Sequence, residues 1–300
     1  MHIKLQGENN YNSMKLGKLD LFVISAGKFW LDGGAMFGVV PKSLWEKKHP
    51  SDEKNRILME TNCPLIHTSD GKWVLVDTGN GTKFSAKEND WYNIESGNPL
   101  EKSLQQHQLT PNNIDIVILS HLHFDHAGGG TRIQNEKIVP TFPNAKYFIQ
   151  KSEWLDASNN RGIMTKTYLK DNFLPLKEHG VLELIDGNHS IHPEIEVLAT
   201  GGHTRGHQAV IFKSEGEKSI YFGDLIPMAS HLPYPYIMAY DTFPLETLEK
   251  KKELLPQIIE EKWLVIWDHD PYCPIGYVNK NDKGRFIFKE LDNKPKSHCH

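Results

Sequence analysis

The chain has 300 residues, of which 38% are hydrophobic, and a formal net charge of −4. This length allows one sizeable core or two small domains, and the slightly acidic balance leaves no basic footprint for nucleic acid. Because no apolar stretch reaches the length of a membrane span and the polar start lacks a signal-peptide core, we expect a soluble cytoplasmic protein. Its three cysteines do not amount to a disulfide framework, and a pairing of Cys63 with Cys273 stays open.

Regular patterning begins at Met14 and runs almost to the end of the chain. We therefore expect a loose N-terminal extension over residues 1–13, a single domain over 14–292 and a C-terminal tail over 293–300. One domain is preferred to two because the residues with metal-ligand character, discussed below, are drawn from positions 121 to 269 and must share one core.

Strands and helices are both predicted, which indicates an α+β fold. Strands are expected, in chain order, at 16–24, 56–66, 72–77, 114–119, 146–150, 181–185, 195–199, 209–212, 220–222 and 263–267. Helices are expected at 100–108, 151–157, 165–174 and 244–261. The last is amphipathic and should turn these residues towards the core: Leu245, Leu248, Leu254, Leu255, Ile258 and Ile259.

The densest chemical signal follows the apolar strand 114–119. The chain there reads His121-Leu122-His123-Phe124-Asp125-His126 and then turns at two glycines. Side chains alternate along an extended segment, so His121, His123 and Asp125 should point to one side and His126 towards a second ion. Imidazole and carboxylate donors favour zinc, although manganese and iron tolerate the same set. The run predicts a metal site.

Three later strands end on similar donors. Strand 195–199 leads to His203, strand 220–222 to Asp224, and strand 263–267 to His269. Rigid strands that end at one rim are a sensible way to preorganise metal ligands. His207 follows His203 by four residues, but in a turn rather than a helix, so we interpret His207 as a hydrogen-bonding support for a ligand.

These motifs resemble those of the metallo-β-lactamase superfamily. The strand and turn at 74–79 resemble the family's first motif, and the four later motifs occur in the family's order. The resemblance implies a four-layer αβ/βα sandwich. It also implies one ion on His121, His123 and His203, a second on Asp125, His126 and His269, and Asp224 bridging both. The second set uses Asp and His rather than Cys, which is closer to the lactonase, glyoxalase II-like and organophosphate hydrolase-like branch.

The reaction that the resemblance implies is hydrolysis of a small molecule. Two divalent ions, with zinc favoured, would share a hydroxide that attacks an ester or lactone carbonyl, and Asp125 and Asp224 would be the catalytic carboxylates. A phosphotriester hydrolase and a single-iron sulfur dioxygenase stay open as alternatives. The partner is a small-molecule substrate, with no nucleic acid or membrane, and a homodimer is also left open.

Two segments outside the motifs are candidates for the substrate pocket. They are an apolar loop loosened by glycines over 29–38 and the aromatic stretch 228–240; packing as core or as a dimer interface is the competing interpretation. Lactonases of this superfamily have a helper tyrosine shortly after the bridging aspartate, but Asp224 is followed by Leu-Ile-Pro, so Tyr234 or Tyr236 would have to replace it. The pocket candidates are Phe29, Trp30, Met36, Phe37, His231, Tyr234 and Tyr236.

Overall fold

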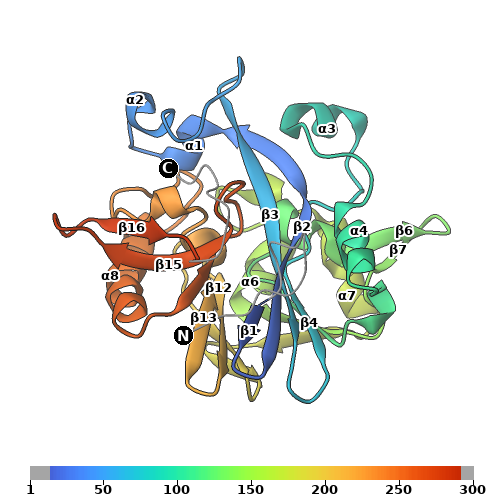
Figure 1. Cartoon of the computed structure of the whole chain (residues 1–300). Helices are drawn as coiled ribbons and strands as arrows, with labels where there is room; N and C mark the ends of the chain where they lie inside the picture. Colours follow the sequence, from blue (N-terminus) through green and yellow to red (C-terminus); the bar gives the residue numbers. More distant parts are fainter. Residues whose placement is uncertain (1–13, 292–300) are drawn as a thin grey trace.

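A computed structural model of the chain describes residues 14–291. Two seven-stranded sheets lie face to face, with helices on their outer faces (Figure 1). The predicted four-layer sandwich is therefore confirmed. The predictions for residues 1–13 and for the tail lie outside the described residues.

The first sheet has the order β1-β2-β3-β4-β5-β8-β9. Its strands are antiparallel up to β4 and parallel from β4 to β9. Their bounds are β1 (Met14–Leu16), β2 (Leu19–Asp32), β3 (Arg56–His67), β4 (Trp73–Val76), β5 (Ile116–Ile118), β8 (Lys146–Gln150) and β9 (Leu182–Ile185).

The second sheet has the order β10-β11-β12-β13-β14-β15-β16. It is antiparallel except between β13 and β14. Its strands are β10 (His189–His192), β11 (Ile195–Ala199), β12 (Gln208–Ser214), β13 (Glu217–Tyr221), β14 (Leu264–Ile266), β15 (Ile275–Lys280) and β16 (Phe286–Lys289). A separate hairpin pairs β6 (Thr131–Gln134) with β7 (Lys137–Pro140).

The helices are mostly short. The α-helices are α1 (Gly33–Phe37), α2 (Lys42–Trp45), α3 (Ala86–Tyr92), α4 (Pro99–Gln106), α5 (Phe124–Ala127), α6 (Lys151–Ser158), α7 (Leu174–Glu178) and α8 (Pro244–Glu260). Single 3-10 turns are η1 (Pro111–Asn113), η2 (Gly128–Gly130), η3 (Thr165–Thr167), η4 (Lys170–Asn172), η5 (Gly223–Leu225) and η6 (Ala229–His231).

Alternation along the strands builds the layers. On β4, Val74 and Val76 face the core between the sheets, whereas Leu75 faces the layer that contains α4, α6 and α7. On β14, Ile266 faces the core between the sheets and Val265 packs with α8. The strands β4 and β14 therefore bury both of their faces. The polar residues of the rim follow the ends of such strands.

Three sequence expectations for elements are wrong. The single strand at 16–24 is two strands, β1 and β2, joined by a turn in which Gly17 has φ +58°, and a Cβ there would lie 2.6 Å from the Ser214 carbonyl oxygen. The apolar loop at 29–38 is the end of β2 followed by α1. The helix at 165–174 is instead two 3-10 turns before α7, where a proline stands at the second position.

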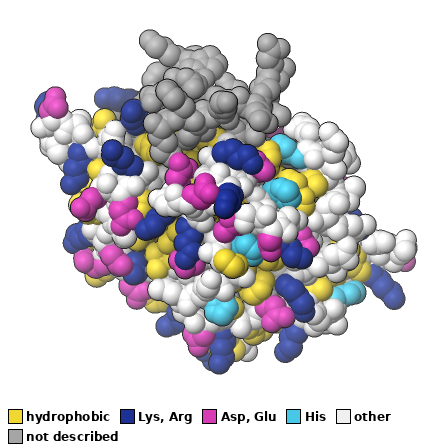
Figure 2. Space-filling model, turned by 60° about the horizontal axis from the view of Figure 1, so that its bottom comes forward, with side chains coloured by type: hydrophobic (Ala, Val, Ile, Leu, Met, Phe, Trp, Pro, Cys, Tyr) yellow, Lys and Arg dark blue, Asp and Glu magenta, His cyan; other side chains and the backbone are white. Residues whose placement is uncertain are grey.

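The surface charge agrees with the composition. Acidic and basic side chains are interspersed over the face that Figure 2 shows, which is consistent with the small net charge. Among the described helices, none has the length and apolar character needed to cross a membrane.

Cys63 is a free, buried thiol, so the pairing of Cys63 with Cys273 does not form.

Candidate metal centre

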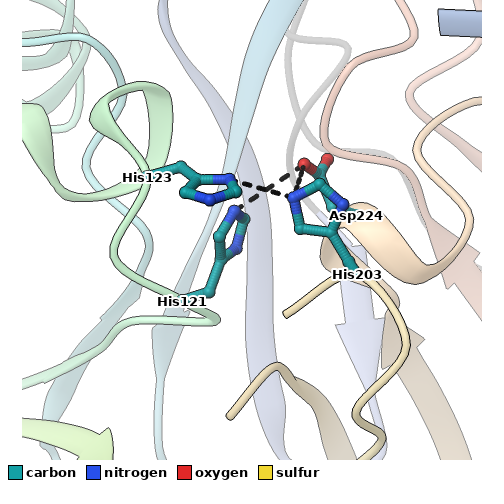
Figure 3. Close-up of side chains that lie close together, drawn as sticks. All are labelled: His121, His123, His203 and Asp224. Atoms are coloured by element: carbon teal, nitrogen blue, oxygen red, sulfur yellow. Dashed lines mark hydrogen bonds and ion pairs between the residues drawn. The ribbon is translucent and has the colours of Figure 1, made fainter. Parts of the chain in front are cut away.

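Chain segments from both sheets bring their donors to one rim. The segment after β5 supplies His121 and His123, and the segments after β11 and β13 supply His203 and Asp224 (Figure 3). In Figure 3 the four side chains point towards one another from opposite sides of the site. All four are buried. The donors that the sequence predicted for the first ion do converge.

The first donor group consists of the four residues His121, His123, His203 and Asp224, and its donor atoms lie close together. The His203 Nε2 atom lies 3.0 Å from the Asp224 Oδ2 atom and 3.0 Å from the His123 Nδ1 atom. The His121 Nε2 atom lies 3.7 Å from Asp224 Oδ2 and has no hydrogen-bond partner among the described residues. A bound cation would satisfy this buried nitrogen, which is otherwise costly to desolvate.

The second group shares Asp224. It consists of His126, Asp224, Asp268 and His269, whose donor atoms all lie within 4.8 Å of one another. The His269 Nε2 atom lies 3.1 Å from Asp224 Oδ1 and 3.2 Å from His126 Nε2. Asp125, the carboxylate expected from the sequence, is also close, with Oδ2 3.5 Å from His269 Nε2 and Oδ1 3.9 Å from His126 Nε2. Asp268 was not expected.

Hydrogen bonds fix which nitrogen of each ring faces the site. The Nδ1 atoms of His126 and His203 lie 2.8 Å and 2.9 Å from carboxylate oxygens of Asp77 and Asp241. The Nδ1 atom of His269 lies 2.8 Å from the backbone carbonyl oxygen of Glu60. In all three rings these acceptors hold a proton on Nδ1 and turn Nε2 towards the site, where Nε2 would bind a cation.

Asp77 and Glu153 hold the loops that carry these rings. Asp77, in the turn after β4, accepts hydrogen bonds from the Ser120 amide and from the Tyr221 hydroxyl, both at 2.7 Å. Glu153, buried in α6, accepts from the Leu122 amide at 2.9 Å and from the Thr204 hydroxyl at 2.6 Å. Each carboxylate therefore joins a loop of the first sheet to a residue of the second half of the chain.

His207 is not in either group of donors. Its Nδ1 atom lies 2.6 Å from the Thr200 hydroxyl oxygen, and its ring packs beside His121 at 5.3 Å between centroids. A Cβ on Gly223 would lie 2.8 Å from the His207 Nε2 atom, and Gly223 has φ +53°. The glycine therefore gives the chain room to turn over His207 and place Asp224. This packing supports the expected positioning role of His207.

Burial and carboxylates set the protonation states of the imidazoles. Burial lowers the pKa of His121 and of His123 well below the usual value, so both rings are neutral, the form that binds metal. For His126 burial also opposes the charge, but Asp125, Asp224 and Asp77 outweigh it and raise the pKa well above the usual value. The same negative field would favour a divalent cation.

An apolar hollow of about 230 Å³ opens over both groups. The donors His123, Asp125, His203, Asp224 and His269 contribute to its lining. Lys166 and Thr167 also line it. The remaining wall is aromatic or aliphatic and comes from Leu31, Met36, Tyr92, Phe124, Met164, Met238 and Tyr240. A small molecule with an apolar part fits such a wall.

Of the pocket residues expected from the sequence, only Met36 lines this hollow. The expectation is revised because the other rings pack against protein. Phe29 packs beneath His269, at 5.5 Å between centroids, and Trp30, its neighbour on β2, is partly buried. Phe37 stacks on His231 and contacts Tyr236, while Tyr234 packs on Phe286. Tyr92 and Tyr240, which the sequence did not single out, supply the phenols.

Comparison with known proteins agrees with this geometry. Residues 57–269 match the metallo-beta-lactamase superfamily. The chain belongs to that superfamily. With two donor groups that share Asp224, this member is a dinuclear metal-dependent hydrolase.

The individual relatives of this superfamily member have low sequence identity to it, but the matches cover most of each chain. An N-acyl homoserine lactonase of Bacillus cereus is 25% identical over 272 residues, which cover 83% of this chain and 92% of the relative. A probable metal-dependent hydrolase of Staphylococcus aureus has 29% identity and a TM-score of 0.83, covering 93% and 99%. The dizinc quorum-quenching lactonase AidC, with its product N-hexanoyl-homoserine bound, has the same fold at 24% identity and a TM-score of 0.78, covering 95% and 99%.

Proposed function

We propose that this protein opens a lactone, or cleaves an ester, whose acyl part is apolar. The observation that carries the proposal is the position of the two donor groups at the floor of a hollow walled by methionine, leucine and aromatic side chains. The N-acyl homoserine lactonase relatives support the same substrate class.

Two divalent ions in these groups, with zinc favoured, would activate water at neutral pH and polarise a carbonyl. The residues present fit such ions, because imidazoles and carboxylates converge in each group with their donor atoms within 4.8 Å of one another. The protein's own residues then orient the substrate. Met36, Met238 and Phe124 exclude water from the acyl part, and Asp125 stands at the wall of the hollow where a proton must reach the leaving oxygen.

The proposal is tested by a hydrolysis screen with metal analysis of the same sample. We expect turnover of lactones with medium-length acyl chains, and abolished turnover in Asp224→Asn, because Asp224 contributes to both groups. A phosphotriester as the only substrate would replace the lactone proposal with the organophosphate alternative. Oxygen consumption with one bound iron would replace it with the sulfur dioxygenase alternative.

A further inference from the structure

Asp268 is a buried carboxylate with no assigned partner. It directly precedes His269 at the end of β14, and its exposed fraction is 1%. Neither of its side-chain oxygens has a hydrogen-bond partner among the described residues. Buried polar groups in proteins are almost always hydrogen-bonded, paired or bound to a metal, so these two oxygens call for a partner.

The nearest hydrogen-bond donors, Asn62 and Tyr221, do not reach these oxygens. The backbone amide of Asn62 donates to the Asp268 backbone carbonyl rather than to the carboxylate. The Tyr221 hydroxyl, which lies nearby, donates to Asp77. The Asp268 carboxylate lies within ion-pair distance of His269 and His126, two rings whose Nε2 atoms face the site. Asp268 is therefore aimed at the second donor group.

The distances are those of ligands on one ion. The Asp268 Oδ2 atom lies 3.5 Å from His269 Nε2 and 4.0 Å from His126 Nε2. Zinc binds nitrogen and carboxylate oxygen at about 2.0–2.2 Å, so two ligand atoms of one ion lie at most about 4.4 Å apart. Both distances meet this limit, as do those of Asp125.

We propose that Asp268 is a further ligand of the second ion and that it makes the two metal sites chemically unequal. The first site then has three imidazoles and the shared Asp224, whereas the second has two imidazoles and the carboxylates of Asp125, Asp224 and Asp268. Carboxylate ligands suit manganese, whereas imidazole ligands suit zinc. The second site should therefore be the one that exchanges zinc for manganese.

The test compares metal binding by the wild type and by Asp268→Asn, which preserves size and removes charge. Full-length protein is stripped, reloaded with zinc or manganese, and dialysed against graded chelator before metal analysis. We expect the variant to keep one ion at wild-type affinity and to hold the second at least about 10-fold more weakly, with the larger loss for manganese. Two ions bound with wild-type affinities would overturn the proposal.

Asp270→Asn is the matched control. Asp270 is a buried carboxylate two residues from Asp268, but its side chain accepts hydrogen bonds from the backbone amides of Ala229 and Tyr272 and lies outside both donor groups. We expect this variant to bind both ions as the wild type does. An equal loss in Asp270→Asn would show that any missing charge near the site weakens binding, and this result would also count against ligation by Asp268.

A measurement on the wild type keeps the proposal testable if Asp268→Asn does not fold. In a crystal structure of the metal-loaded protein, an Asp268 oxygen should lie within about 2.0–2.3 Å of the second ion. A separation above about 3 Å would refute ligation. The inference rests on the dinuclear site and not on the substrate, so a protein that binds two ions but hydrolyses no lactone would refute only the proposed function.

Discussion

At the scale of single residues, the hollow contains two phenols that the sequence did not indicate. Tyr240 is partly buried and lines the hollow together with Asp125 and Asp224. Burial raises its pKa, and the neighbouring carboxylates add to this effect, so its hydroxyl stays protonated at neutral pH. A protonated phenol can donate a hydrogen bond to an oxygen that gains negative charge during the reaction.

We therefore expect Tyr240→Phe to lower kcat by about 100-fold with a small change in KM, because the lost hydrogen bond forms mainly in the transition state. Steady-state kinetics on the best lactone from the screen measures both constants. Tyr234→Phe is the matched control, since Tyr234 packs on Phe286 outside the hollow, and it should leave both constants unchanged. A fall of less than about 3-fold for Tyr240→Phe would exclude this role.

The sequence could indicate donors by type and spacing, but not their partners. His121, His123 and His126 stand out because three imidazoles follow one strand. The groups that orient two of the other rings do not stand out in the sequence. They are Asp241, which holds His203, and the Glu60 carbonyl, which holds His269. Each comes from a remote part of the chain and has no local pattern. Asp268 was visible beside His269, but only the structure shows that its oxygens are unpaired.

At the scale of elements, α8 supports the metal centre with polar residues on its buried face. Thr247 donates a hydrogen bond to Asp241, which in turn accepts one from His203. Lys251 has no exposed surface, and its Nζ atom donates to the carbonyl oxygens of residues 231, 233 and 236 at 2.6–2.9 Å. The helix thereby fixes the loop that leads to Met238 and Tyr240 at the wall of the hollow.

The hydrophobic period of the sequence predicted the helix itself, but not every residue on its buried face. Leu254, Leu255 and Ile258 are buried as expected. Leu248 and Ile259 are partly buried, whereas Leu245 is 75% exposed and is a correction. Hydrophobic periodicity cannot indicate that Thr247 and Lys251 are buried, because their burial depends on acceptors in a loop that the helix meets only in the folded chain.

We expect Lys251→Met to lower the free energy of unfolding by about 3 kcal/mol, because buried carbonyl oxygens would lose their donor. Urea unfolding with unchanged m-value measures the loss. Lys252→Met is the control, since Lys252 is exposed and pairs with Glu249 on the surface, and it should stay within about 0.5 kcal/mol of the wild type. Equal stability of the two variants would contradict the supporting role of Lys251.

At the scale of the whole molecule, the metal centre joins the two halves of the sandwich. The segment after β5 supplies His121, His123, Asp125 and His126, and the second half of the chain supplies His203, Asp224, Asp268 and His269. Without cations, the donors of the two halves meet through contacts between imidazoles and carboxylates, such as that of His126 with Asp224. Bound ions would therefore act as cross-links between the halves. The homodimer that the sequence leaves open stays an untested hypothesis.

Metal removal should consequently lower the thermal stability of the whole protein. Each ion present at about 1,000 times its dissociation constant stabilises the folded state by about 4 kcal/mol, and a chain of this size loses about 2–4 °C in Tm for each kcal/mol. We expect chelation to lower Tm by at least about 10 °C and zinc to restore it, as measured by calorimetry with metal analysis. Asp224→Asn should respond to zinc far less, because both donor groups lose a ligand. An unchanged Tm in protein shown to be free of metal would mean that the contacts between the sheets hold the rim together without ions.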